Sequence, residues 1–308
     1  MSPLARMQKN LFGLAASSAL LFAGCGHMPT PNGPVADVKT VALYRSEFDL
    51  GAGGGGAEAA APQGKPTGWA TLTGSVKLAG GAAAAPAANP IDITKDKDIC
   101  APGGKPVLSN EFVVGPSGGI ANVLVYVNTA LPPEEPFTHP SAVGLKDPFV
   151  FDQKQCRFLS HVAAFQVTQP VDIKNSDNVG HNTAIAPSNP ADNRKFDQTI
   201  PQGGSDTYTF AKAENSPATV SCAVHPWMKA YMIARPNGYF AVTHDDGKFE
   251  LKNVPAGVDL QIAVWHEKIP AAKEATFSDA ALKINKGKFT VKLEPAKTKD
   301  VEITLTQK

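Results

Sequence analysis

The 308-residue sequence has almost no excess charge of either sign and only four cysteines. Its 29 basic and 28 acidic side chains give a formal net charge of +1, and they form no basic patch and no run of one sign. Nucleic-acid-binding surfaces need clustered Lys and Arg, so none is expected here. Beyond the N-terminal region no apolar run is long enough to cross a bilayer. The composition therefore gives no reason to expect a nucleic-acid-binding protein or a membrane-spanning one.

Two signatures of common enzyme classes are also missing. The sequence has no His-Glu-x-x-His run of a zinc protease, and no glycine loop followed by Lys and Ser or Thr that would bind phosphate. The oligoglycine run at 53–56 has neither a strand pattern before it nor a helix pattern after it. We therefore expect that the protein is not an enzyme.

The N-terminal residues indicate that the protein is located in the cell envelope. Arg6 and Lys9 precede an apolar run over residues 11–23, which is too short for a transmembrane helix and typical of a secretory signal. The run ends Leu-Phe-Ala-Gly-Cys, which resembles the lipobox of bacterial lipoproteins. This resemblance implies removal of residues 1–24 and a lipid anchor at Cys25, with the periplasmic side of the outer membrane as the default location. The alternative is an ordinary signal peptide with an unmodified Cys25.

Removal of residues 1–24 leaves a nearly neutral chain. Residues 25–67 are rich in Gly, Ala and Pro and cannot bury enough apolar area to fold, so they predict a flexible tether.

The most informative stretch is Ser-Cys-Ala-Val-His-Pro-Trp-Met at 221–228, which brings Cys222, His225 and Met228 into one short loop. A Gly-His-Asn sequence upstream adds His181. Two imidazoles, one thiolate and a weak axial thioether form the ligand set of electron-transfer copper sites. A zinc site is the chemical competitor, but Met is a poor zinc ligand and the chain has no Cys-x-x-Cys pair. The pattern thus indicates one copper ion that cycles between Cu(I) and Cu(II).

Cys-x-x-His-x-x-Met after an upstream His-Asn resembles the cupredoxins, of the amicyanin and plastocyanin type. The likeness covers residues 148–236 and implies a Greek-key β-sandwich with His181, Cys222 and His225 as equatorial ligands and Met228 as the axial ligand. Asn182 would steady the ligand loop by hydrogen bonding near the Cys sulfur.

By the same resemblance His225 would be the ligand nearest the surface, inside an apolar docking patch that includes Pro226 and Trp227. Implied partners are redox proteins such as a periplasmic dehydrogenase or a c-type cytochrome. A multicopper oxidase would need several His-x-His pairs, and the sequence has none. Copper storage or delivery, and a metal-free structural lipoprotein, remain as alternative functions.

The rest of the chain predicts further β-structure. Short β-branched runs, separated by Gly and Pro turns, point to an all-β protein with a second small sandwich. Asp246-Gly247 lies between two such runs and predicts a hairpin. Residues 239–265 resemble the carboxypeptidase regulatory-like sandwich, and Gly74-Ser75-Val76 resembles its first strand. This implies that residues 68–147 and 237–308 are the two parts of such a module. The two segments form either one discontinuous sandwich with the copper domain inserted, which we prefer, or two domains in series.

Two cysteines remain after residues 25 and 222 are assigned. In an oxidising envelope Cys100 and Cys156 are reasonably paired as a disulfide. Closure of such a loop contributes about 4 kcal/mol in the chain-entropy model. Two independent buried thiols are the alternative.

Overall fold

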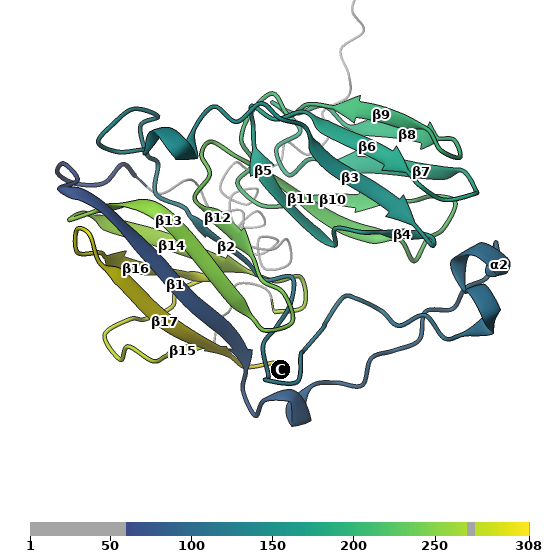
Figure 1. The fold of residues 1–308 in the computed structure, drawn as a ribbon, viewed down its shortest axis with the longest axis horizontal. Helices are drawn as coiled ribbons and strands as arrows, with labels where there is room; N and C mark the ends of the chain where they lie inside the picture. Colours follow the sequence, from purple (N-terminus) through teal and green to yellow (C-terminus); the bar gives the residue numbers. More distant parts are fainter. Residues whose placement is uncertain (1–59, 270–274, 308) are drawn as a thin grey trace, which may run out of the picture. The chain divides into compact units, whose positions relative to one another are not determined.

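The computed structural model describes residues 60–269 and 275–307, and these belong to one compact unit. The predicted signal peptide, Cys25 and the tether up to residue 59 lie outside the described residues. Nearly all regular structure is strand, which confirms the prediction of an all-β protein (Figure 1). The described part contains one short α-helix, α2 (Lys97–Cys100), and three 3₁₀ turns, η1 (Ala82–Ala84), η2 (Pro102–Gly104) and η3 (Pro140–Ala142). None of the helices described is long and apolar enough to cross a membrane.

The first sandwich is built from two segments that are distant in sequence. One of its sheets has the order β13-β1-β17-β15 and the other β12-β2-β14-β16. The strands are β1 (Gly68–Leu78), β2 (Leu124–Val127), β12 (Phe240–Val242), β13 (Lys248–Ala256), β14 (Asp259–Trp265), β15 (Ala275–Phe277), β16 (Lys288–Lys292) and β17 (Thr298–Leu305). Since β1 and β2 each lie between C-terminal strands, the sandwich is discontinuous. Of the two arrangements considered from sequence, the structure has the insertion.

The inserted sandwich occupies the chain between β2 and β12. Its sheets have the orders β5-β11-β10-β7-β8 and β4-β3-β6-β9. The strands are β3 (Phe149–Lys154), β4 (Arg157–Phe158), β5 (Val162–Gln166), β6 (Val171–Asn175), β7 (His181–Ala186), β8 (Phe196–Ile200), β9 (Ser205–Tyr208), β10 (Ala218–Ser221) and β11 (Lys229–Arg235). All four predicted copper ligands lie in this unit.

Strand β1 shows why the sequence folds as it does. Its buried positions alternate with partly exposed ones, as expected for a strand with one face on a core. Gly74 occupies one of the inward positions, and a Cβ atom there would lie 2.1 Å from the carbonyl oxygen of Val301 on β17. Glycine therefore permits the close approach of β1 to its parallel neighbour.

The hairpin predicted at Asp246-Gly247 is wrong in part. Gly247 has a φ of +71° and its N–H donates to the carbonyl of His244 at 2.9 Å, so the tight turn is present. The flanking strands do not pair with each other, because β12 pairs with β2 and β13 pairs with β1. Long-range pairing with β1 thus decides the partner of β13, and the turn becomes a corner between two sheets.

Each sandwich has its own apolar core. Residues such as Leu72, Val125 and Ile303 form one cluster, and Phe151, Phe165 and Met232 belong to the other. The second cluster also holds Cys222 and Met228, so the predicted copper loop is part of that core.

Candidate metal centre

A short loop between β10 and β11 carries three of the predicted ligands. Ser221 and Lys229 face each other as the last pair of the two antiparallel strands. Inside that pair the N–H of Cys222 donates to the carbonyl of Met228 at 3.3 Å, and the N–H of Met228 donates to the carbonyl of His225 at 2.9 Å. These backbone bonds fold the loop back on itself, so that its side chains originate close together.

The fourth predicted ligand, His181, begins β7, the other neighbour of β10. The next residue, Asn182, donates its backbone N–H to the sulfur of Cys222 at 3.3 Å. The pairing of β7 with β10 therefore places His181 beside the ligand loop, although the two segments are far apart in sequence.

The ligand atoms converge in the interior of the protein. Nδ1 of His181 lies 2.9 Å from Nδ1 of His225, and Nδ1 of His225 lies 4.0 Å from the sulfur of Cys222. The ligand atoms of these three residues all lie within 4.8 Å of one another. Both histidines are 0% exposed, Cys222 is 2% exposed and Met228 is 1% exposed. The structure thus brings together the two imidazoles and the thiol that the sequence predicted as equatorial ligands, and buries the thioether in the same core.

The Nε2 atom of each imidazole, the nitrogen that points away from the other ring, is hydrogen-bonded to a carboxylate. Nε2 of His181 lies 2.7 Å from Oδ2 of Asp177, and Nε2 of His225 lies 2.9 Å from Oδ2 of Asp96. A carboxylate only accepts, so each Nε2 must carry the hydrogen. A neutral ring then presents its lone pair at Nδ1, toward the other ring.

Two lone pairs that face each other at 2.9 Å are unfavourable unless a metal ion or a shared proton lies between them. Burial lowers the pKa of His181 from its usual range, against the opposing effect of Asp177, and so favours the neutral ring with a free Nδ1. Metal-binding histidines typically donate their other ring N–H to a carboxylate or carbonyl, which fixes the tautomer. The donor set of two imidazoles, a thiol and a buried thioether fits a copper ion.

Asn182 ties the ligand loop to the strands. Its Oδ1 accepts from the N–H of Ala223 at 3.1 Å, and its Nδ2 donates to Oδ1 of Asp197 at 2.7 Å. With the backbone bond to the Cys222 sulfur, this residue contacts both the thiol and the residue that follows it in the loop. The contacts are those expected of a residue that steadies the loop.

Comparisons with known proteins show a weak likeness that covers part of the chain. No protein-family model matches the sequence, and no curated protein matches it. Amicyanin from Paracoccus versutus is 17% identical with a TM-score of 0.26, and the match covers 36% of this chain and 97% of that chain. A mutant of amicyanin in its Cu(I) form is 16% identical with a TM-score of 0.26, over 37% of this chain and 99% of that chain.

A copper-containing nitrite reductase from Thermus scotoductus SA-01 is 18% identical with a TM-score of 0.26, over 29% of this chain and 22% of that chain. These similar structures are cupredoxins. The likeness is confined to about a third of the chain, and we therefore base the functional proposal on the geometry of the site.

The cupredoxin resemblance predicts that His225 lies near the surface, and this prediction is wrong. His225 is fully buried because the segment around Asp96 covers its outer nitrogen. Pro226 is exposed and Trp227 is half-buried, and both line a hollow of about 230 Å³ that also borders His161. Pro226 and Trp227 therefore give the ligand loop an apolar surface, but the imidazole of His225 is not exposed within it.

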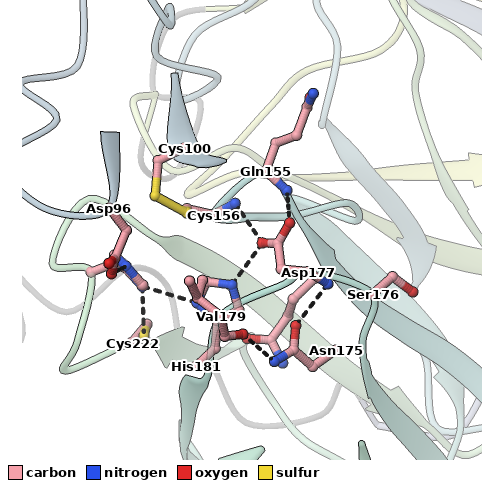
Figure 2. A network of polar contacts seen from close by, with 12 residues as sticks. Asp96, Cys100, Gln155, Cys156, Asn175, Ser176, Asp177, Val179, His181 and Cys222 are labelled. Atoms are coloured by element: carbon pink, nitrogen blue, oxygen red, sulfur yellow. Dashed lines mark hydrogen bonds and ion pairs between the residues drawn. A yellow bond between two sulfur atoms is a disulfide. The ribbon is translucent and has the colours of Figure 1, made fainter. Parts of the chain in front are cut away.

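Two functional residues were missed from sequence. Asp177 was read only as the end of a strand pattern, although its position four residues before His181 was a usable signal. Its two oxygens also accept from the N–H groups of Gln155 and Cys156, as Figure 2 shows. Asp96 lies far from the motif in sequence, and no local pattern points to it.

The predicted disulfide between Cys100 and Cys156 is present, with a sequence separation of 56. It lies next to the site: the indole N–H of Trp227 donates to the carbonyl of Cys156 at 3.1 Å, and Asp177 joins the N–H of Cys156 to His181. The pairing thus connects the segment before β2 with the ligand region (Figure 2).

A serine-hydrolase pattern, Gly-x-Ser-x-Gly, occurs once, at 115–119. Its glycines form a tight turn in which the N–H of Gly115 donates to the carbonyl of Gly119 at 2.9 Å, and Ser117 is exposed. A nucleophile elbow needs a strand before the serine and a helix after it. The residues described around this turn include neither.

Proposed function

We propose that residues 148–236 hold one copper ion and that the protein carries single electrons between redox partners. The observation that supports this most directly is the pair of Nδ1 atoms of His181 and His225, which face each other beside the thiol of Cys222. With Asp177 and Asp96 bound at their Nε2 atoms, both rings turn Nδ1 toward the same point. A copper ion bound there would supply one-electron exchange between Cu(I) and Cu(II).

The donor set favours copper over zinc. Cys222 would provide the thiolate and His181 and His225 the two imidazoles, with Met228 as a weak fourth donor. Structural zinc sites take four strong N, S or O donors, and a thioether is not among them. Soft sulfur and imidazole together suit a metal that changes between two oxidation states.

The surrounding residues hold the ligands still. Both imidazoles are fixed by carboxylates, and Asn182 binds the Cys222 sulfur and the N–H of Ala223. Since the ligands are buried in a packed core, their positions would change little with the charge of the metal. A rigid site of this kind lowers the reorganisation that accompanies electron transfer.

The partner would be another redox protein, such as a periplasmic dehydrogenase or a c-type cytochrome. The exposed Pro226 and half-buried Trp227 supply an apolar surface close to the site. Weak redox encounters use small interfaces, so this surface would suit a brief contact.

The proposed location is the bacterial cell envelope, with lipid attached to Cys25. The support is the resemblance of residues 21–25 to a lipobox and the presence of a disulfide, which persists in oxidising compartments. The periplasmic side of the outer membrane is the favoured site of attachment.

A redox titration tests this function. The purified full-length protein is loaded with one equivalent of copper, freed of excess metal and titrated with reductant and then oxidant. We expect the uptake and return of one electron per protein over repeated cycles, with the metal retained. Loss of copper on reduction would favour storage or delivery, and a failure to bind copper would favour a structural, metal-free lipoprotein.

A further inference from the structure

The chain between β1 and β2 contains a segment, residues 89–109, that we call the strap. Its two arms lie side by side: the N–H of Ile91 donates to the carbonyl of Val107 at 2.7 Å, and the N–H of Ser109 donates to the carbonyl of Asn89 at 2.9 Å. The strap is thus a closed excursion of the chain, with α2 near its tip.

In sequence the strap belongs to the discontinuous sandwich, but it packs on the inserted one. Its buried side chains, Ile93 and Cys100, are members of the core cluster that contains Cys222 and Met228. Arg157 on β4 donates a guanidinium N–H to the carbonyl of Leu108 at 2.9 Å. Apolar packing and this polar contact both hold the strap against the copper-binding unit.

The disulfide anchors the tip of the strap. Cys100 is 1% exposed and Cys156 is 0% exposed, so a thiol in solution has no direct access to the bond. Thiol–disulfide exchange requires attack on an accessible sulfur. We therefore regard this disulfide as a permanent attachment.

One helical turn connects the disulfide to the metal ligand. The N–H of Cys100 donates to the carbonyl of Asp96 at 2.9 Å. The carboxylate of Asp96 accepts a hydrogen bond from Nε2 of His225. Asp96 has a φ of +50°, in the left-handed region. Glycine, which has no Cβ atom, adopts this conformation more easily. Such residues persist where the surroundings hold them, and they gather at functional sites.

We propose that Asp96 is a positioning residue for the copper ligand His225, and that the strap is a fixed cover over this side of the site. Asp96 holds the ring with Nδ1 turned to the metal, and the disulfide holds Asp96. The strap also excludes water and competing ligands from His225, which slows the release of copper. This inference rests on the proposed copper site.

The cover changes where a partner can approach. The side chain of Asp96 is 31% exposed while that of His225 is fully buried, so a partner on this face meets the strap and the neighbouring Pro226 in place of an imidazole edge. Electrons would cross the hydrogen bond between Asp96 and His225, or leave through the ligand loop.

The first test needs no copper. Nitrogen-15 NMR of the histidine rings in the metal-free, full-length protein reports which ring nitrogen carries hydrogen. We expect His225 as a single Nε2–H tautomer in the native protein and in Asp98→Asn, a control that removes an exposed carboxylate from the same helix. Asp96→Ala should give mixed tautomers. An unchanged tautomer in Asp96→Ala would overturn the positioning role, whether or not the protein binds copper.

The second test measures copper release to a Cu(I) chelator from the loaded protein. Removal of a hydrogen-bond partner of a metal-bound histidine weakens metal binding by about 10–100-fold. We expect a loss of this size in Asp96→Ala, most of the affinity restored in Asp96→Asn, which keeps an acceptor, and no change in Asp98→Asn. Equal release from Asp96→Ala and Asp98→Asn would contradict the proposal.

A double variant, Cys100→Ser with Cys156→Ser, distinguishes the effect of the disulfide that anchors the strap from the effect of the Asp96 carboxylate. If the disulfide holds Asp96 in place, this variant releases copper as fast as Asp96→Ala while its far-ultraviolet circular dichroism stays native. Native release rates with the disulfide removed would overturn the anchoring role. Should the double variant fail to fold, the Asp96 and Asp98 variants still decide the proposal. A native protein that binds no copper refutes the proposed function and leaves the NMR test standing.

Discussion

The Nδ1 atoms of His181 and His225 face each other at 2.9 Å in a fully buried site, while the Nε2 atom of each ring is bound to a carboxylate. Two neutral imidazoles so arranged repel unless a cation lies between them. The thiol of Cys222 lies beside the pair, 4.0 Å from Nδ1 of His225. These nitrogen and sulfur atoms therefore form a group that could hold a metal ion.

Replacement of the thiol tests the role of Cys222. In Cys222→Ser the soft ligand is lost while the side-chain volume changes little, so the intense visible band of a thiolate–copper bond should disappear. The absorption spectrum of the copper-loaded variant measures this. Ser221→Ala, at the exposed neighbouring position, should keep the band. A metal-dependent spectrum unchanged in Cys222→Ser would show that Cys222 is not a ligand.

Met228 and Met232 offer a matched pair of substitutions. Both are buried in the same core cluster, but only Met228 lies in the ligand loop. Leucine is close to methionine in volume, so each Met→Leu change should cost less than about 1.5 kcal/mol of stability. Met228→Leu should shift the reduction potential and the visible spectrum, because it removes the axial donor, and Met232→Leu should leave both near native values. Equal effects of the two changes would argue against Met228 as a ligand.

Loss of the Asn182 side chain should loosen the ligand loop. Asn182→Ala removes the acceptor for Ala223 and the donor to Asp197, and each net hydrogen bond contributes about 1 kcal/mol. We expect a fall in stability of roughly 1–2 kcal/mol, measured by denaturant unfolding. Copper should also leave the variant faster, because the backbone near Cys222 moves more freely.

The exposed Thr199 on β8 supplies the control for Asn182. Thr199→Ala should change neither copper release nor unfolding by a comparable amount. Copper release from Asn182→Ala at the native rate would mean that the loop is held by its backbone bonds alone.

His266 should make the stability of the protein depend on pH. Burial lowers the pKa of His266 from 6.5 to about 4, and the nearby His161 and Lys268 act in the same direction, opposed by Glu267. The N–H of Lys268 donates to Nδ1 of His266 at 3.1 Å, which also favours the neutral ring. Above pH 6.5 the ring is neutral in both states and contributes no pH dependence. As the pH falls from 6.5 toward 4, the unfolded state binds the proton first, so the free energy of unfolding decreases by up to roughly 3 kcal/mol.

Urea unfolding of the metal-free protein between neutral pH and pH 4 measures this effect. His266→Asn retains a hydrogen-bond acceptor and should remove much of the decrease between pH 6.5 and pH 4. His244→Asn, at an exposed histidine, should leave the decrease as in the native protein. If both variants keep the native pH profile, His266 is not the group responsible.

The candidate ligand set could be proposed from the sequence because three of its four members are close together in the chain. Cys222, His225 and Met228 lie in one loop, and their spacing carries the chemistry without any knowledge of the fold. The alternation of apolar residues in β1 likewise predicts a strand with one buried face. The pairing of Cys100 with Cys156 followed from the small number of cysteines and the expected compartment.

The contacts that control the ligands depend on tertiary structure and were not predicted. Asp96 reaches His225 only because the strap folds across a different sandwich, and its sequence neighbourhood is that of an ordinary polar loop. The same long-range effect prevented the predicted hairpin at Asp246-Gly247: the turn is present, but β13 pairs with β1 and not with β12. Local patterns pointed to the candidate ligands, and the topology determined what covers them.

The most direct test of the central claim is the spectrum of the purified full-length protein after addition of Cu(II) and removal of excess metal. Visible absorption and electron paramagnetic resonance should show an intense thiolate-to-copper charge-transfer band and narrow copper hyperfine splitting, at one copper per protein. A colourless protein without bound copper would contradict the account.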